Sequence, residues 1–317
     1  MPEVVALGET MVLMNPETSG PLRYVHRFTK QIGGAESNFC IGVVRLGHTA
    51  GWISRLGDDE LGRFVLHSIR GEGVDTSRVS FDSEAPTALM FKERRELGET
   101  KVYYYRRYSA ASLMTPDDLD EEYIGSAKFL HLSGITPALS VSCHETVLAA
   151  MEMARKLGVK ISFDPNLRLR LWSAAEARRV LVDLMGRADI VLPGVGEAEV
   201  ILGTRDPVAI ADQILSLGAS LVAVKLGAEG AYVADKDGNR FRSPGFTVKR
   251  VVDPVGAGDA FAAGFLVGLL RNYPLDECAR LANAVGAFAV TVTGDIEGLP
   301  SNEELAEFLG ESEAIDR

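Results

Sequence analysis

The chain has 317 residues, of which 46% are hydrophobic and 24% are charged, and its formal net charge is −11 at pH 7. A chain of this length and apolar content can bury the core of one large domain, which argues against intrinsic disorder. The acidic balance argues against a general nucleic-acid-binding protein, because such a protein needs a basic face to displace counterions from phosphates. An anionic small-molecule substrate stays open, since a pocket can be locally basic.

Three features of the sequence predict in which cellular compartment the protein works. The chain begins MPEVVALGET, where an acidic third residue leads at once into a strand-like run, so we expect no signal peptide. The longest apolar run, residues 260–270, is shorter than the roughly 20 residues that a membrane-spanning helix needs. Cys40, Cys143 and Cys278 are widely spaced and form no CxxC motif, so we expect them to be reduced thiols. Together these features predict a cytoplasmic protein with no membrane contact.

Strand-like and helix-like segments alternate along most of the chain. Helical periodicity covers residues 145–157 and 174–184. Apolar strands separated by such helices predict an α/β fold with a mostly parallel central sheet that is covered on both faces. Ligands of such sheets collect at the carboxyl ends of the strands. The short β-rich runs lie at residues 4–9, 50–57, 129–134, 159–166, 189–194 and 220–227.

Two segments interrupt this alternation. Residues 21–31 and 88–108 alternate polar residues with aromatic or aliphatic ones, as strands of a sheet with one solvated face do. The second segment would form a hairpin that turns at Gly98. We expect both segments to form a small β appendage beside the main domain. Its exposed aromatic residues could cover a pocket, a second subunit, or both.

Near the C-terminus a glycine-rich turn, VGAGD at residues 255–259, leads into the apolar run 260–270. The N–H groups at a helix start are unpaired and carry partial positive charge, so such a turn favours an anion, phosphate above all. Because the following helix is apolar on all sides, it should be buried with its N-terminus open to a pocket. Asp259 could simply cap this helix. A carboxylate beside an anion site also suits phosphoryl transfer, in which it would accept a hydroxyl proton.

Other well-known motifs do not occur in the sequence. A Walker P-loop needs GxxxxGK[ST], and the chain has no Gly-Lys dipeptide. The dinucleotide fingerprint GxGxxG fails because Phe261 stands at its third glycine position, which argues against an NAD-dependent oxidoreductase. The sequence contains neither HExxH nor GxSxG, and its five histidines have no metal-ligand spacing.

Motifs near both ends of the chain resemble those of one family. Residues 253–265, DPVGAGDAFAAGF, resemble the signature D-[TP]-x-G-A-G-D-x-F-x-x-G of the ribokinase-like (PfkB) sugar kinases. Residues 32–47 and 55–65 resemble the other signature of that family, GG-x-x-x-N-x-A…LG…G-x-D-x-x-G. The motifs occur in the expected order, so the resemblance spans essentially the whole chain.

This resemblance implies a three-layer ribokinase-like fold and a catalytic role for the turn. Residues 1–317 would form a single kinase domain, with a β-sheet lid at about residues 12–32 and 86–110. Asp259 would be the catalytic base. The backbone amides that stabilise the transferred phosphoryl group would be those of Gly256, Ala257 and Gly258.

Within the family, residues 102–112, 129–140 and 164–172 most resemble the kinases of 2-keto-3-deoxygluconate, a sugar acid. An Arg guanidinium can hold a carboxylate through two hydrogen bonds. In a strand over residues 102–108, Tyr104, Arg106 and Tyr108 would share one face and Tyr103, Tyr105 and Arg107 the other, and the resemblance selects the first face. At the position of Met90, some relatives carry a Tyr that contacts the substrate. Met has no hydroxyl group, so this difference affects the preference among similar substrates. The substrate-binding residues that the resemblance implies are Gly34, Tyr104, Arg106, Ile135, Arg168 and Asp295.

The same resemblance implies which residues bind the nucleotide and its metal ion. Residues 225–233, KLGAEGAYV, resemble the nucleotide loop of the family. The N-x-x-E motif linked to magnesium keeps Glu197 but has Gly194 in place of Asn. Mg²⁺ bound to a nucleotide needs few protein ligands, so we expect ATP and Mg²⁺ to be used, with Glu197 linked to the metal indirectly; a monovalent cation such as K⁺ could also take part. The implied ATP-contacting residues are Lys225, Gly227, Ala228, Gly230 and Asn283.

These features predict an ATP-dependent kinase that phosphorylates 2-keto-3-deoxygluconate at O6, as in the Entner–Doudoroff route. Its partners would be the sugar acid, ATP and further copies of itself, joined through the β lid. The alternative is a kinase of a neutral sugar or nucleoside, resembling fructokinase or ribokinase. Arg106 and Arg168 argue against it, because a neutral substrate would leave two cations unpaired. A non-catalytic sensor would not need Asp259. The sequence does not distinguish the gluconate-derived from the galactonate-derived epimer.

Overall fold

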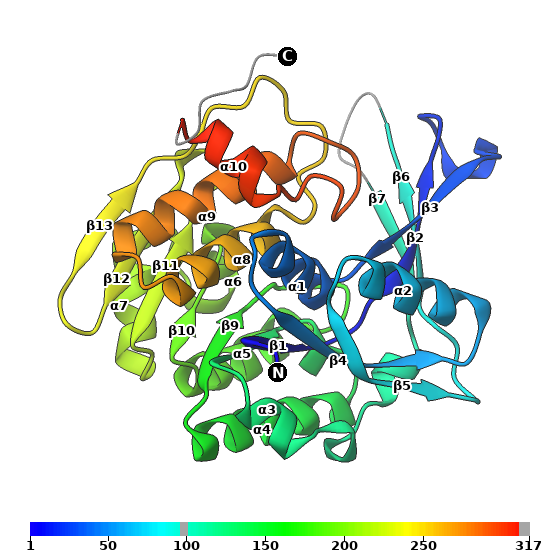
Figure 1. Ribbon diagram of the computed structural model, residues 1–317, viewed down its shortest axis with the longest axis horizontal. Coiled ribbons are helices and arrows are strands. Elements are labelled where there is room, and N and C mark those ends of the chain that lie inside the picture. The colour runs from blue at the N-terminus through cyan, green and yellow to red at the C-terminus, as the bar shows by residue number, and fades with distance from the viewer. Residues whose placement is uncertain (96–100, 311–317) are drawn as a thin grey trace.

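The structure is a computed structural model that describes residues 1–95 and 101–310. Strands and helices alternate along the chain and form a nine-stranded sheet, with a separate four-stranded sheet to one side (Figure 1). The nine strands are β1 (Val4–Leu7), β4 (Ala50–Gly57), β5 (Asp75–Asp82), β8 (Phe129–Ser133), β9 (Lys160–Asp164), β10 (Ile190–Val191), β11 (Leu221–Lys225), β12 (Ala231–Asp235) and β13 (Arg240–Ser243).

The nine-stranded sheet has the order β13-β12-β11-β10-β9-β8-β1-β4-β5. Neighbouring strands are parallel from β11 to β5, and only the β11–β12 and β12–β13 pairs are antiparallel. This confirms the predicted α/β fold with a mostly parallel sheet. The six predicted strands all occur. The antiparallel strands β12 and β13 were not among them, and neither was the edge strand β5. Its exposed and buried residues follow no clean alternation, which weakens the strand signal.

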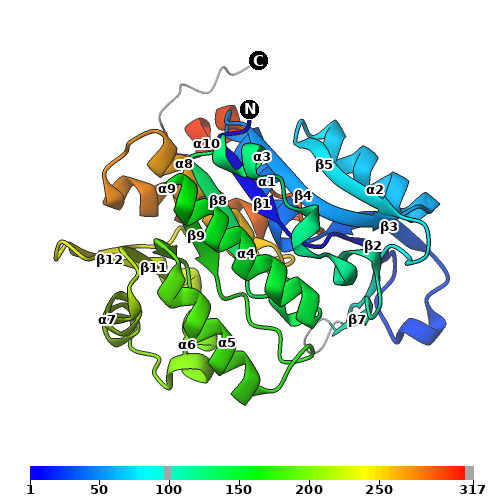
Figure 2. The same cartoon turned by 90° about the horizontal axis from the view of Figure 1, so that it is seen from below.

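Helices cover both faces of this sheet, which gives three layers (Figure 2). The residues of β1 show why, because Val4 and Ala6 pack into one core cluster and Val5 and Leu7 into the other. One layer contains α1 (Ala35–Arg45), α2 (Glu60–Gly71), α8 (Ala257–Leu270), α9 (Leu275–Ala289) and α10 (Asn302–Phe308). The other contains α3 (Glu121–Gly125), α4 (Val141–Leu157), α5 (Ala174–Arg187), α6 (Val195–Leu202) and α7 (Pro207–Leu217).

The four-stranded sheet, called the lid sheet from here on, has the order β3-β2-β6-β7. Its strands β2 and β6 are parallel, and the outer pairs are antiparallel. The predicted small β-sheet lid is therefore present. Its strands are β2 (Met11–Pro16), β3 (Phe28–Gly33), β6 (Leu89–Glu93) and β7 (Lys101–Tyr105).

Details of the lid sheet differ from the sequence prediction. The segment predicted as a strand from residue 21 begins with a short 3-10 helix, η1 (Leu22–Tyr24), directly after Pro21, and β3 starts only at Phe28. Proline fixes φ and lacks a backbone donor, so the chain turns there rather than joining a ladder. The hairpin turn predicted at Gly98 lies outside the described residues.

Other helix boundaries follow local capping. Helix α4 begins at Val141, earlier than its periodicity indicated, because the Ser140 hydroxyl accepts a hydrogen bond from the N–H of Cys143. Helix α8 begins directly after Gly256, and its residues from Ala260 to Val267 are all buried, as predicted.

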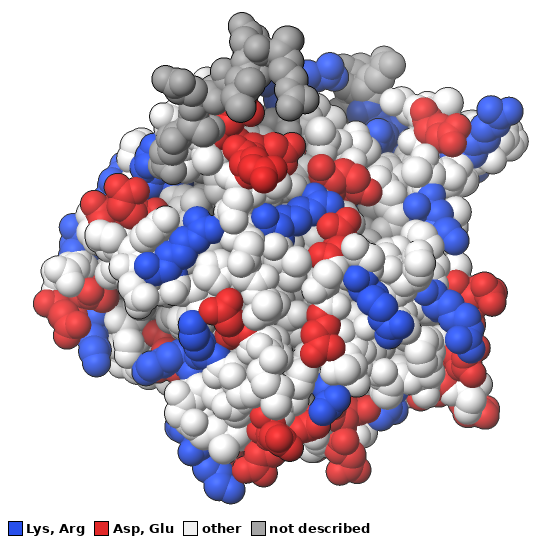
Figure 3. All heavy atoms as spheres, in the orientation of Figure 1, with Lys and Arg blue, Asp and Glu red and all other residues white. Residues whose placement is uncertain are grey.

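The surface carries charges of both signs. On the face shown in Figure 3, Lys and Arg side chains are interspersed with Asp and Glu side chains. Among residues 1–95 and 101–310, no helix combines the length and the apolar character that crossing a bilayer requires.

Candidate active site

The largest group of predicted site residues lines one cavity of about 450 Å³, called the lid cavity here. It lies between the lid sheet and the carboxyl ends of the parallel strands, as expected for this kind of sheet. Glu9 follows β1, Ile135 follows β8 and Asn166 follows β9, while Lys225 ends β11. From the lid sheet, Met11, Met90, Val102 and Tyr104 complete the wall.

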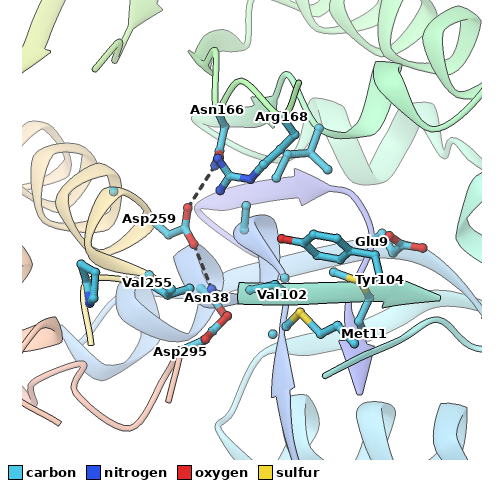
Figure 4. A pocket seen from close by; sticks show the side chains of 18 of the residues that line it. Glu9, Met11, Asn38, Val102, Tyr104, Asn166, Arg168, Val255, Asp259 and Asp295 are labelled. Carbon is cyan, nitrogen blue, oxygen red and sulfur yellow. Dashed lines mark hydrogen bonds between the residues drawn. The ribbon is translucent and has the colours of Figure 1, made fainter. Parts of the chain in front are cut away.

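The Asp259 carboxylate lies in the first turn of α8, between two amide side chains (Figure 4). Asn38 donates a hydrogen bond from Nδ2 to Oδ2 at 2.9 Å, and Asn166 donates one from Nδ2 to Oδ1 at 3.3 Å. Burial raises the pKa of Asp259 to about 7, although the Asn38 hydrogen bond and the charges of Arg168 and Lys225 oppose this shift. A carboxylate with such a pKa can accept a proton near neutral pH.

The turn before Asp259, residues 254–258, is called the anion turn here. Gly256 has φ +84°, and a Cβ at this position would lie 2.7 Å from the backbone oxygen of Asp295. Only glycine fits such a backbone without strain. The first N–H groups of α8 have no acceptor within the helix, and Gly256 and Gly258 both line the lid cavity. The turn therefore offers the partial positive charge that the sequence predicted.

A buried ion pair lies beside Asp259. Lys225 Nζ is 2.5 Å from Asp164 Oδ2, and Asp164 Oδ1 accepts the N–H of Asn166 at 3.1 Å. Burial favours the neutral amine, but the charges of Asp164 and Glu197 raise the pKa of Lys225 above its usual value. Lys225 is therefore a fixed cation beside the anion turn.

A second cavity of about 390 Å³ meets the lid cavity at Lys225, Pro254 and Gly258, and is called the α8–α9 cavity here. Its apolar wall includes Phe246 and Val290. All five residues predicted to contact a nucleotide line it: Lys225, Gly227, Ala228, Gly230 and Asn283.

Two of these nucleotide candidates have clear structural roles. Gly230 has φ +97°, and a Cβ there would lie 2.1 Å from the backbone oxygen of Ser243. Asn283 donates hydrogen bonds from Nδ2 to the backbone oxygens of Ser243 and Pro244 at 3.2 and 3.1 Å. Asn283 thus holds the loop after β13 in place, and the missing side chain of Gly230 lets that loop pack closely at one wall of the α8–α9 cavity.

The six predicted substrate-binding residues all line the lid cavity. Gly34 lies between β3 and α1, and a Cβ there would lie 2.4 Å from the backbone oxygen of Glu9. Ile135 is buried, whereas Arg168 is exposed at the rim. The complete set is Gly34, Tyr104, Arg106, Ile135, Arg168 and Asp295.

The predicted common face of Tyr104, Arg106 and Tyr108 is wrong for its last member. Strand β7 ends at Tyr105, and Tyr108 has φ +59° and is 72% exposed. Tyr104 and Arg106 do line the cavity together, with the guanidinium carbon 5.5 Å from the ring centre of Tyr104. The chain leaves the strand because the Arg106 side chain turns into a buried pocket.

Arg106 already has an acidic partner, which the sequence did not reveal. Its Nη2 lies 2.5 Å from Glu9 Oε2, with the two side chains 8% and 0% exposed. Glu9 Oε1 also accepts a hydrogen bond from the Ser109 hydroxyl at 2.6 Å. Contrary to the prediction, a neutral substrate would therefore not leave Arg106 unpaired.

Asp295 also has a buried partner. Its Oδ1 lies 2.9 Å from Nζ of Lys92, a lid-sheet residue, and the same ammonium is 2.8 Å from Asp253 Oδ2. Nothing in the sequence singled out Lys92, which resembled a polar residue on the solvated face of a strand. Asn38, in contrast, stands inside the GG-x-x-x-N signature, and Asn166 lies in the family-like stretch 164–172, so both could have been found there.

Glu197 has both carboxylate oxygens occupied by backbone donors. Oε2 accepts the N–H of Gly194 at 2.8 Å and Oε1 accepts the N–H of Leu167 at 2.9 Å. Burial raises the pKa of Glu197, although the charge of Lys225 opposes this shift. The described part of the chain contains no group of three or more His, Cys, Asp or Glu that could hold a metal ion. A magnesium ion here would therefore depend on nucleotide phosphates and water for most of its ligands.

Comparison with known proteins adds to this geometry. Residues 1–302 match the family model described as pfkB family carbohydrate kinase. A 2-dehydro-3-deoxygluconokinase from Bacillus subtilis (strain 168) is 42% identical over 99% of this chain and 97% of the relative. One from Thermoproteus tenax is 40% identical over 98% of this chain and 94% of the relative. Fructokinase-1 of Zea mays is 37% identical over 96% of this chain and 97% of the relative.

Solved structures are similar over the same length. A PfkB protein from Polaromonas sp. JS666 superposes with a TM-score of 0.88 at 40% identity, covering 96% of this chain and 99% of that chain. A putative ribokinase II from E. coli in complex with ATP and Mg²⁺ gives a TM-score of 0.91 at 26% identity, covering 98% and 100%.

Proposed function

This chain belongs to the pfkB family of carbohydrate kinases, and on that premise we propose that it transfers the γ-phosphoryl group of ATP to O6 of 2-keto-3-deoxygluconate. The reaction is a phosphotransfer to an alcohol group, and the product would be 2-keto-3-deoxy-6-phosphogluconate. Relatives that are 40–42% identical over nearly the whole chain are named for this substrate under its synonym 2-dehydro-3-deoxygluconate.

One observation carries the proposal. Asp259 lines the lid cavity and directly follows Gly258, an anion-turn residue that lines both the lid cavity and the α8–α9 cavity. A sugar under the lid sheet and a nucleotide against α8 and α9 would therefore meet at this carboxylate. Tyr104, Arg106 and Arg168 line the sugar side, where they could bind the hydroxyl and carboxylate groups of a sugar acid.

The chemical step follows from these positions. The O6 hydroxyl would transfer its proton to Asp259 while O6 forms a bond to the γ-phosphorus. The bond between that phosphorus and the β,γ-bridging oxygen would break, and ADP would leave. The amides of Gly256, Ala257 and Gly258 would stabilise charge on the transferred group. General-base assistance contributes about 10²–10⁴-fold to such reactions, and positioning and electrostatics supply the rest.

The α8–α9 cavity has an apolar part and a positively charged part, as a site for ATP requires. Phe246, Val248 and Val290 offer an apolar surface for a base, while Lys225 and the anion turn face the phosphates. Bound Mg²⁺ would neutralise phosphate charge. Glu197 would act on it only indirectly, because it holds the backbone of Gly194 and Leu167.

A kinase of a neutral sugar is the second candidate. Arg106 is paired with Glu9, so a neutral substrate would meet no unpaired guanidinium at this position. The 37% identity to a fructokinase from Zea mays points the same way. Against this, Arg168 stands exposed at the rim of the cavity and is available to a carboxylate.

The discriminating experiment is a coupled ADP-release assay over a panel of acceptors. The panel contains 2-keto-3-deoxygluconate, its galactonate-derived epimer, gluconate, fructose, ribose and adenosine, with Asp259→Asn as the blank. We expect the two 2-keto-3-deoxy sugar acids to give the highest kcat/KM and ³¹P NMR to locate the product phosphate at O6. Higher kcat/KM for fructose or ribose would replace the proposal with the second candidate. Exchanging K⁺ for Na⁺ in the same assay tests the monovalent cation.

We also propose that the protein works in the cytoplasm. Cys40, Cys143 and Cys278 are free and buried. Burial raises the pKa of Cys143 to about 11, so its thiol stays protonated and unreactive. Free thiols of this kind fit a reducing compartment. Localisation of a tagged full-length chain by cell fractionation tests this.

A further inference from the structure

Lys92 is a buried cation between two carboxylates that are distant in sequence. It belongs to β6 of the lid sheet, and its side chain is 1% exposed. Its Nζ donates hydrogen bonds to Asp253 Oδ2 at 2.8 Å and to Asp295 Oδ1 at 2.9 Å, and each of these carboxylates is 5% exposed. Burial alone would lower the pKa of Lys92, but the charges of Asp295 and Asp253 raise it, so the ammonium stays charged. These three residues are called the Lys92 triad.

Both carboxylates of the triad are joined to the anion turn. Asp253 precedes that turn, and its Oδ1 accepts the N–H of Val255 at 3.2 Å. The backbone oxygen of Asp295 packs against Gly256, at 2.7 Å from the position that a Cβ would occupy. A movement of either carboxylate would therefore shift the backbone that leads to Asp259.

The lysine end of the triad is joined to the sugar side of the lid cavity. Lys92 pairs with Val102 across β6 and β7, and Met90 pairs with Tyr104 in the same register. Met90, Val102 and Tyr104 all line the lid cavity. One buried ammonium thus connects the wall that would hold the sugar with the turn that would hold the phosphoryl group.

Stability alone does not explain such an arrangement. Buried charges lose their hydration, and replacing a buried ion pair by apolar residues of similar volume is often neutral or stabilising. Burial also raises the pKa of Asp295, although the charge of Lys92 opposes this shift, so burial works against the charged carboxylate that the ion pair requires. The hydrogen bonds of the triad do fix distances between segments that are far apart in the chain.

We propose that Lys92 is a positioning residue that fixes the position of the lid sheet relative to the anion turn. Lys92 binds Oδ1 of Asp295, which leaves Oδ2, close to Gly33 in the wall of the lid cavity, as an acceptor for a sugar hydroxyl. This inference rests on the proposed kinase function and adds to it the residue that aligns the two substrates.

The first test is Lys92→Met, which keeps an unbranched apolar chain and removes the charge. We expect kcat/KM for the acceptor to fall on the order of 10²-fold, because misplacement by about 1 Å can cost that much. The Kd of ATP, measured by calorimetry, should stay within about threefold, because most of the lining of the α8–α9 cavity, including Phe246 and Asn283, lies outside the anion turn. The matched control is Lys30→Met on β3 of the same sheet, where an exposed lysine lies over the Phe64 ring at 4.0 Å. This control should behave as the wild type.

Two further variants separate positioning from folding. Lys92→Met leaves two carboxylates buried without a cation, so its melting temperature should fall. Adding Asp253→Asn removes one of these charges and should restore thermal stability without restoring kcat/KM. In Lys92→Ala, millimolar propylammonium should recover part of kcat/KM by filling the vacated site, whereas propanol should not.

The acceptor is itself proposed, so one measurement does not depend on it. Hydrogen exchange of the amides in residues 253–260 should be faster in Lys92→Met than in the wild type, and unchanged in Lys30→Met. If the wild type prefers another acceptor in the panel, the proposed function fails, and the Lys92 variants are compared on that acceptor. Wild-type kcat/KM and exchange in Lys92→Met would overturn the inference. Recovery of activity together with stability in the double variant, or an equal loss of ATP affinity, would overturn it as well.

Discussion

At the scale of single residues, the carboxylate of Asp259 must be ionised before it can accept a proton. Burial raises its pKa to about 7, and the hydrogen bond from Asn38 lowers it. The group is therefore protonated and inactive below this pH, and ionised and active above it. The pH dependence of the reaction should report this balance directly.

We predict that kcat/KM for the sugar acceptor falls about tenfold per pH unit below pH of about 7 and is level above it. In Asn38→Ala the carboxylate loses a donor that favours its charged form, so the inflection should move to higher pH. Initial rates at low acceptor concentration, measured from about pH 5 to about pH 9, give both profiles. An inflection that is absent from the wild type, or that moves to lower pH in the variant, would contradict the role of Asp259 as base.

The Glu9–Arg106 pair changes how Arg106 should be tested. Arg106→Ala alone would leave the Glu9 carboxylate buried without its partner, which would destabilise the protein and repel an anion. The double variant Glu9→Gln/Arg106→Met removes both charges together. We predict that it raises KM for the sugar acid by about 10- to 100-fold, the value of one or two charge-assisted hydrogen bonds, and changes KM for fructose by less than about threefold.

The ADP-release assay measures both KM values on the same preparation. Equal changes for the acidic and the neutral sugar would mean that Arg106 does not bind the carboxylate. Arg168 would then be the remaining candidate on the sugar side of the cavity, and Arg168→Met would be tested in the same way.

At the scale of elements, the start of α8 depends on two glycines for different reasons. Gly256 has φ +84°, and its missing Cβ leaves room for the backbone oxygen of Asp295. Gly258 has helical geometry, and a Cβ there would meet only Lys225 Nζ, at 3.4 Å. The first glycine is required by the fold, whereas the second keeps the surface beside Lys225 open.

We predict that Gly256→Ala lowers the free energy of unfolding by about 1–3 kcal/mol, since a strained backbone and a close contact are both introduced. Gly258→Ala should unfold at the wild-type temperature or slightly above it, because alanine favours helices. It should still lose most of its kcat, because its methyl group projects where phosphates would approach. Thermal denaturation and ADP release measure the two effects. Similar melting temperatures for both variants would contradict the assignment.

The lid strands show where sequence patterns stop being informative. The buried residues of β2 follow no alternation, because its two sides pack against the lid cavity and against α2. The alternation in β7 is clear, yet the strand ends at Tyr105, where Arg106 turns toward Glu9. A strand pattern can be predicted from neighbouring residues, but its end depends on a partner elsewhere in the chain.

At the scale of the whole molecule, the outer side of the lid sheet carries a row of aromatic rings. Phe28 and Phe91 lie 5.4 Å apart between ring centres, and Phe91 and Tyr105 lie 5.9 Å apart. Tyr105 is 65% exposed and Tyr103 is 39% exposed. Exposed aromatic rows of this kind are typical of protein interfaces.

We predict that the protein is a homo-oligomer joined through this surface, and that Tyr105→Glu dissociates it by placing a charge in an apolar contact. Sedimentation velocity at micromolar concentration measures the mass of both proteins. Val141→Glu, at an exposed position on α4, is the matched control and should leave the mass unchanged. A monomeric wild type would contradict this prediction.

Much of the molecule follows from local sequence. The alternation of strands and helices determined the α/β fold, and the VGAGD turn determined a buried helix with an anion-friendly start, because each depends on residues that are adjacent in the chain. The tertiary structure alone decided the ion pairs. Lys92 meets Asp253 and Asp295 across 161 and 203 residues, and Arg106 meets Glu9 across the boundary between the two sheets. Burial and pairing of charges depend on which strands lie side by side, and no local pattern records that.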